Sequence, residues 1–107
     1  MQEKNKGWST VKEDERYVVT DNNLLKNLVA SATYLNQDKS NSGHKHPGQE
    51  EVYVFMTGTG KMEIDDRTFE FKPGDVVLIE DGEFHRVHND GNEILEFVCV
   101  FDGKRSH

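Results

Sequence analysis

Hydrophobic residues along this chain fall in short runs, and many of these runs alternate with polar residues as a β-strand does. We expect strands over residues 17–19, 51–56, 61–64, 67–71, 76–79, 84–88 and 94–101. Turns rich in Gly, Pro, Asn and Asp separate them, at residues 57–60, 65–66, 72–75, 81–83 and 89–92. Short strands separated by turns at this density predict an all-β sandwich or barrel.

Three segments do not show the simple alternation of apolar and polar residues. The apolar residues of 24–35 have helical spacing at first, but residues 28–35 also alternate as a strand, and the β-rich remainder favours the strand. Residues 76–79 are four apolar residues in a row, which predicts a strand buried on both faces. Residues 1–16 are charged and weakly patterned, so we expect an N-terminal arm before a single domain over residues 17–107.

The composition limits the partners of this protein. Its 107 residues are enough for one domain but not for two. A net charge of −7, without any run of Lys or Arg, makes it a poor ligand for phosphate backbones. No apolar run approaches the roughly 20 residues that cross a membrane, and no apolar signal-peptide core follows the polar N-terminus. We therefore expect a cytoplasmic protein that binds neither nucleic acid nor a membrane.

Three histidines and one glutamate form a pattern typical of a metal site. His44 and His46 are separated by one residue, so on extended backbone both imidazoles face the same side. Glu51 begins the next strand, and His85 lies on a later one. This ligand set suits one divalent transition metal ion: Mn, Fe, Co, Ni, Cu or Zn. Four protein ligands would leave two positions of an octahedral ion open for a small-molecule substrate.

These residues also fill two motifs of the cupin family. The first motif, G-x5-H-x-H-x(3,4)-E-x6-G, is filled by His44, His46, Glu51 and Gly58. The second motif, G-x5-P-x-G-x2-H-x3-N, is filled by Gly74, Gly82, His85 and Asn89. Two fixed positions differ, since Asp38 replaces the first glycine and Glu80 replaces the proline.

The chain therefore resembles the small single-domain cupins. The resemblance implies a jelly-roll β-barrel with the four ligands at its mouth or centre, and a homodimer formed through N-terminal strands. Glu50 is the competing carboxylate, but only Glu51 keeps the six-residue gap to Gly58 and the register with Tyr53. His88, three residues after His85, should point to the opposite face and lie at the surface.

Aromatic and apolar residues are expected to line the pocket beside the metal. Tyr53 and Phe55 share the face of Glu51. Tyr53 is either a general acid or base, or a core tyrosine with a satisfied hydroxyl. On the last strand, an inward face should complete the pocket with Leu95, Phe97, Cys99 and Phe101.

The resemblance implies several functions. The leading hypothesis is an enzyme whose metal acts as a Lewis acid on a polar substrate, sugar-acid-like or another carboxylate, in an isomerase or lyase reaction. The alternatives are an Fe or Ni dioxygenase and a non-catalytic cupin that binds or senses a small molecule such as a sugar. The chain is similar to cupins that ketonise unsaturated uronates, although Cys99-Val100-Phe101 stands where those carry D-x-F. It also resembles cupins that cleave dimethylsulfoniopropionate, which carry a tyrosine at the position of Tyr53.

Overall fold

The computed structural model describes residues 5–103 and 105, and the secondary structure of these residues consists of nine β-strands. In chain order they are β1 (Trp8–Glu13), β2 (Tyr17–Asn22), β3 (Leu28–Leu35), β4 (Glu51–Thr57), β5 (Gly60–Ile64), β6 (Arg67–Phe71), β7 (Val76–Ile79), β8 (His85–His88) and β9 (Leu95–Asp102). The ambiguous segment 28–35 is a strand, as the β-rich context favours.

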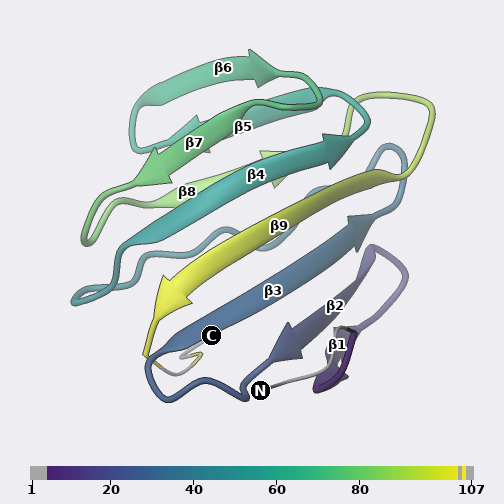
Figure 1. The fold of residues 1–107 in the computed structure, drawn as a ribbon. Helices are drawn as coiled ribbons and strands as arrows, with labels where there is room; N and C mark the ends of the chain where they lie inside the picture. The colour runs from purple at the N-terminus through teal and green to yellow at the C-terminus, as the bar shows by residue number, and fades with distance from the viewer. Residues whose placement is uncertain (1–4, 104, 106–107) are drawn as a thin grey trace.

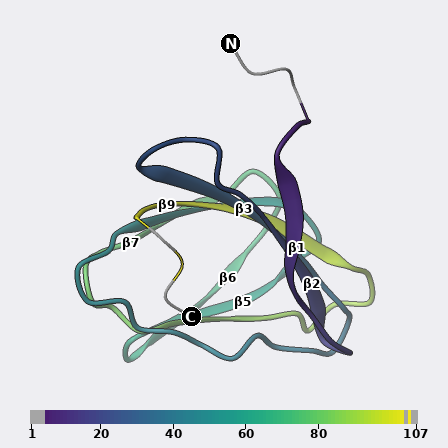
Figure 2. The same cartoon turned by 90° about the horizontal axis from the view of Figure 1, so that it is seen from below.

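The strands form two antiparallel sheets that face each other. One has six strands in the order β1-β2-β3-β9-β4-β7, and the other has three in the order β6-β5-β8. The first sheet lies in front in Figure 1. From below, β9, β3 and β7 form one layer, and β5 and β6 form the other (Figure 2). This arrangement confirms the predicted all-β jelly-roll architecture.

The core lies between the two sheets because each strand alternates inward apolar residues with outward ones. On β9, for example, Leu95, Phe97 and Cys99 are buried, as expected for its inward face. Aromatic rings fill the centre, where Phe55 and Phe71 stack with their centroids 3.7 Å apart. This packing holds β4 and β9 of the larger sheet against β6 of the smaller one.

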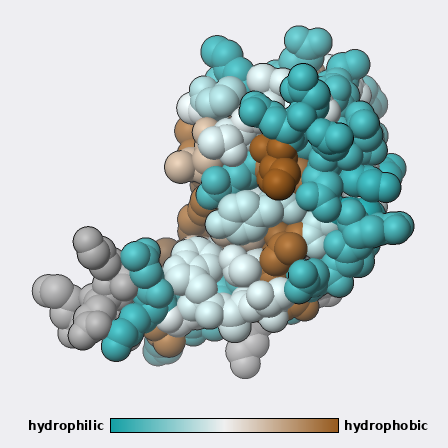
Figure 3. All heavy atoms as spheres, turned by 90° about the vertical axis from the view of Figure 1, so that its right-hand side faces the viewer, coloured by the Kyte–Doolittle hydropathy of each residue, from teal (hydrophilic) through white to brown (hydrophobic). Residues whose placement is uncertain are grey.

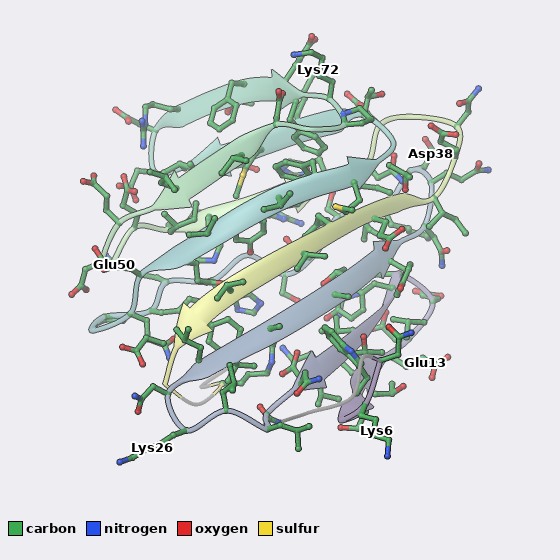
Figure 4. All side chains as sticks on the ribbon, viewed as in Figure 1. Lys6, Glu13, Lys26, Asp38, Glu50 and Lys72 are labelled. Atoms are coloured by element: carbon green, nitrogen blue, oxygen red, sulfur yellow. The ribbon has the colours of Figure 1, made fainter. Side chains whose placement is uncertain are left out.

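The outer face of the six-stranded sheet is apolar. Two rows of small or branched residues cross it from strand to strand: Val76, Val54, Val98 and Ala32 in one row, and Leu78, Val52, Val100 and Ala30 in the other. The side chains that point toward the viewer from β4 and β9 in Figure 4 are mostly carbon. Another side of the molecule, seen in Figure 3, is mostly hydrophilic.

The prediction that residues 76–79 are buried on both faces is wrong for the described chain. Val76 is 58% exposed and Leu78 is 66% exposed, whereas Ile79 is buried. Both faces of this strand are apolar, but for different reasons. One face packs against the core, and the other continues the apolar outer face of the sheet.

The N-terminal segment also contributes to the sheet. β1 lies within the residues expected to form an arm, and it pairs with β2 at the edge of the six-stranded sheet. Across residues 5–103 and 105, no helical segment has the length and apolar character that a membrane span needs.

Candidate metal centre

Backbone hydrogen bonds place the histidine loop against β8. The His44 N–H donates to the carbonyl of His85 (2.9 Å), and the His85 N–H donates to the carbonyl of His44 (2.8 Å). Further along the loop, the Gly48 N–H donates to the Asp81 carboxylate (2.8 Å), next to the turn that precedes β8. Glu51 begins β4 immediately after this loop, so two distant parts of the sequence, residues 44–51 and 81–85, meet at one point.

Three of the four predicted ligands come together there. One ligand atom each from His46, Glu51 and His85 lies within 4.8 Å of the other two. Glu51 Oε1 lies 3.4 Å from His46 Nε2 and 3.1 Å from His85 Nε2. All three residues are buried, with exposures of 5%, 5% and 1%. The three atoms therefore face one another inside the barrel, away from bulk water.

The hydrogen bonding of His85 determines which of its ring nitrogens is available. Its Nδ1 lies 3.1 Å from the carbonyl oxygen of Glu83, which can only accept a hydrogen bond. Nδ1 is therefore the protonated nitrogen, and Nε2 presents a lone pair toward Glu51. Metal-binding histidines have this arrangement, in which the second nitrogen is held by a carbonyl or carboxylate.

The polar atoms of the cluster fit a metal ion. Glu51 Oε1 and His85 Nε2 are buried, and neither makes a hydrogen bond within the described chain. Buried polar groups are rarely left unsatisfied, because each costs free energy. A carboxylate oxygen and a neutral imidazole nitrogen both have lone pairs to offer, so a cation between them would satisfy both. This donor set suits the divalent transition metals.

His44 lies at the border of this cluster. Its ring stacks against that of His46 at 5.5 Å between centroids and lies 6.5 Å from that of His85. Its nitrogens do not belong to the group within 4.8 Å. Burial, followed by the charge of Lys12, lowers the pKa of His44 from 6.5 to about 4. Burial also lowers the pKa of His46, so both rings are neutral at pH 7, as metal binding requires.

The competing residues lie elsewhere. Glu50 is exposed and points away from the barrel at the start of β4 (Figure 4), whereas Glu51 faces inward. His88 is partly exposed on the outer side of β8. Its Nδ1 lies 2.6 Å from Ser40 Oγ, and its Nε2 contacts the Glu63 carboxylate. His88 thus has its own partners, away from the metal cluster.

A small cavity adjoins the cluster. Its volume is about 30 Å³, room for roughly two water molecules. It is lined by Lys12, Tyr17, Val19, Ser31, Thr33, Asn41, His44, Glu51, Tyr53, Phe97, Cys99 and Arg105. Of the expected pocket residues, Phe97 and Cys99 lie on its wall. Phe55, Leu95 and Phe101 are buried in the barrel interior outside this lining.

Tyr53 reaches the cavity beside the metal ligands. Its ring centroid lies 5.6 Å from that of His85, and Tyr53 is the direct neighbour of Cys99 in the pairing of β4 with β9. The two side chains hydrogen-bond, and burial is the main cause that raises the pKa of both groups well above their usual values. Tyr53 therefore carries its proton at neutral pH and can act as a donor.

Several cavity residues were not predicted from the sequence. Ser31 and Thr33 line the cavity and are buried at inward positions of β3, and polar residues at inward positions were the available signal. No sequence pattern indicated that Lys12 and Arg105 line the cavity. Lys12 lies in a weakly patterned segment, and Arg105 follows the last strand.

The fold and these motif residues define a cupin. The cupin domain family (Cupin_2) matches residues 32–101, and the chain belongs to this family.

Named relatives and solved structures are similar to parts of the chain. The oxalate-binding protein of Thermotoga maritima is 39% identical over 57 residues, which are 53% of this chain and 47% of that protein. The structure of a predicted oxalate decarboxylase from T. maritima is 29% identical with a TM-score of 0.70. The alignment covers 79% of this chain and 80% of the chain in that structure.

The structure of KdgF from Halomonas has a TM-score of 0.79, and the alignment covers 92% of this chain and 88% of the KdgF chain. Its identity is 14%, so it supports the fold alone. The chain spans about half the length of the curated relatives that it matches.

A pair of histidine variants tests the metal site. His85→Ala should lower metal affinity by about 100-fold or more, because changes beyond the direct ligands already cost roughly 10–100-fold. His88→Ala, a change of the same kind three residues away on the outer face, should keep the metal. Elemental analysis for Mn, Fe, Co, Ni, Cu and Zn in the purified proteins measures this. Equal loss in both variants would contradict the assignment of His85.

Acidification should destabilise the metal-free protein between about pH 6.5 and 4. The pKa of folded His44 is about 4, whereas an unfolded imidazole has a pKa near 6.5. In this range the unfolded chain takes up a proton that folded His44 does not, so the free energy of unfolding falls as the pH falls. Urea denaturation at several pH values measures the slope. A His44→Asn variant should show a shallower slope, and an identical one would contradict the lowered pKa.

Proposed function

We propose that this protein is a metal-dependent cupin enzyme that acts on a small carboxylate in a lyase or isomerase reaction. The observation that carries the proposal is the buried group of His46, Glu51 and His85 beside a cavity of about 30 Å³. His44 would complete the ligand set after a small rotation of its ring. When bound, a divalent ion supplies Lewis acidity that polarises a substrate oxygen.

The size of the cavity favours a small substrate. Its space corresponds to roughly two water molecules, which favours the smallest carboxylic acids over a uronate. The segment Cys99-Val100-Phe101 also lacks the aspartate of the uronate-ketonising cupins. The relatives from T. maritima, described as an oxalate-binding protein and a predicted oxalate decarboxylase, make oxalate the first acid to test.

The chain's own residues supply the remaining chemistry. His46, Glu51 and His85 orient the substrate by fixing where its oxygens bind. Tyr53 is protonated and buried beside this group, so it would donate a proton to the carbon that loses carbon dioxide or to the carbon that is isomerised. Phe97 and Tyr53 stack with their ring centroids 5.4 Å apart and help to exclude water.

A second candidate is a binding protein without catalysis. The oxalate-binding relative favours it, as does a cavity that encloses only a small ligand. The metal ligands and the cavity would then only bind the acid, and Tyr53 would only donate a hydrogen bond to it.

We also propose that two copies pair through the outer face of the six-stranded sheet. The two apolar rows on this face continue across four strands, and Val76 and Leu78 are more than half exposed. Large exposed apolar patches are unusual on monomers and often mark protein interfaces. Pairing of this face with its copy would bury both rows. It would give a homodimer, as the sequence resemblance implies, but through this sheet face rather than through the N-terminal strands.

Turnover separates the enzyme from the binding protein. Metal-loaded protein is incubated with oxalate and other acids of two to four carbons, and the products are followed by carbon NMR. Tyr53→Phe should retain the metal but lower the turnover by about 10²–10⁴-fold, because a proton donor is lost. The control Tyr34→Phe changes an exposed tyrosine on the outer face and should have no effect. Binding of an acid without consumption would favour the second candidate.

Light scattering tests the dimer. The wild-type protein should have twice the chain mass of 12.3 kDa. Leu78→Glu should shift it to the single-chain mass, because two buried carboxylates would face each other across the interface. Leu78 is 66% exposed in the single chain, so the fold should tolerate the change. Gln37→Glu, in an exposed loop away from this sheet face, is the matched control. A single-chain mass for the wild-type protein would refute the proposed pairing.

A further inference from the structure

The cavity beside the metal ligands is also lined by two cationic side chains. Lys12 comes from β1, and Arg105 follows β9, so they reach the same cavity from opposite ends of the described chain. Hydroxyl and amide groups of Ser31, Thr33 and Asn41 lie on the same lining. The cavity thus has a metal-binding side and a side rich in positive charge and hydrogen-bond donors.

Arg105 is held in place by a buried carboxylate. Its Nε and Nη2 donate to the two oxygens of Asp21 at 2.6 and 2.9 Å, and Nη2 also donates to Ser31 Oγ at 2.8 Å. Asp21 is only 1% exposed. The chain reaches this position after a turn at Gly103, whose φ of +90° favours glycine. Two parallel bonds fix the guanidinium, and Asp21 balances its charge.

Lys12 faces the cavity because of a β-bulge. Thr10 pairs with Thr20, but Lys12 pairs with Val19, so Val11 is an extra residue in β1. Residues directly opposite in an antiparallel pair share a face, and Val19 is buried on the inner one. A regular register would instead pair Lys12 with Val18 and direct it outward. The bulge therefore turns a lysine inward.

Lys12 has no carboxylate in direct contact. It is half-buried, and it forms no ion pair with the acidic residues of the described chain. Burial is the main cause that lowers its pKa, and the charge of Arg105 lowers it further, while the more distant charge of Asp21 raises it. Its charge also acts on His44 across the cavity. An ammonium group that is partly removed from water in this way favours an anionic partner.

The charges in and around the cavity indicate the charge of that partner. Asp21 neutralises Arg105, and Glu51 neutralises one of the two charges of a divalent ion. One positive charge then remains at the metal side, and another remains at Lys12. A ligand with two negative charges would balance these two positive charges.

We infer that Lys12, supported by Arg105 and the donors of β3, binds the second carboxylate of a small dicarboxylate whose first carboxylate lies at the metal. This inference rests on the proposed function and specifies its substrate class: a two- to four-carbon diacid. Lys12 is then a specificity-determining residue that distinguishes diacids from monoacids of the same shape. Arg105 is a positioning residue that shapes the subsite through Ser31.

The test compares two ligands of the same shape and different charge. Oxalate carries two carboxylates, and oxamate replaces one of them with a neutral amide. The protein is loaded with Mn²⁺, excess metal is removed, and both Kd values are measured by calorimetry. Metal content is measured before and after each titration. The wild-type protein should bind oxalate at least about tenfold more tightly than oxamate, as a charge-assisted hydrogen bond requires.

Lys12→Met should weaken oxalate binding by about 10- to 100-fold and leave oxamate binding and Mn²⁺ content unchanged. Lys12→Arg should restore most of the preference for oxalate. Lys39→Met, in an exposed loop outside the cavity lining, is the matched control. Arg105 is left intact, because its loss would bury Asp21 without a cation and endanger the fold.

The failures are distinguishable. If Lys12→Met keeps the wild-type preference for oxalate, or if the wild-type protein holds Mn²⁺ but binds both ligands equally, the inference is wrong and the metal site stands. If the wild-type protein binds none of the transition metals, the proposed function fails and the inference falls with it.

Discussion

The site depends on one carboxylate that the barrel buries without a cation of its own. Glu51 lies between the imidazoles of His46 and His85, and Nδ1 of His85 is held by the carbonyl of Glu83. A buried carboxylate is costly unless an opposite charge or hydrogen bonds compensate it. The cavity, its aromatic walls and its polar far side are arranged around this group, so the binding of an ion is the simplest way to complete the structure.

The two sheets divide the chemistry between them. β8, together with the histidine loop, places two imidazoles, while β4 places Glu51 and Tyr53 on the facing sheet. β2 and β3 extend that sheet beyond β9 with an inner surface that is polar at one end. The cavity between these parts is lined by candidate metal ligands, a phenol and hydrogen-bond donors within a small volume. Under the proposed function, both the size and the charge of a ligand would determine whether it binds.

Periodicity was sufficient for most of the strands, and the spacing of the motifs selected His46, Glu51 and His85, which the structure brings together. His44 was predicted as a fourth ligand, but it lies at the border of this group, because the spacing of residues in a loop does not determine how each ring is turned. The exposure of Leu78 escaped prediction because an apolar run has the same appearance whether the core or an outer apolar face lies beside it. The direction of Lys12 depends on a single bulge, which pattern analysis does not reveal. The position of Arg105 depends on a turn after the last strand and on a buried partner far away in sequence.

The position of β9 has a consequence for how the chain folds. β9 lies between β3 and β4 in the larger sheet, although it comes after both of them in sequence. During synthesis, β3 and β4 are exposed to the solvent with open hydrogen-bonding edges until residues 95–102 leave the ribosome. Unpaired edges of this kind invite pairing with other chains. The rate at which β9 completes the larger sheet, rather than the stability of the finished fold, would then determine how much soluble protein the cell obtains. Chaperones that shield strand edges would raise this yield.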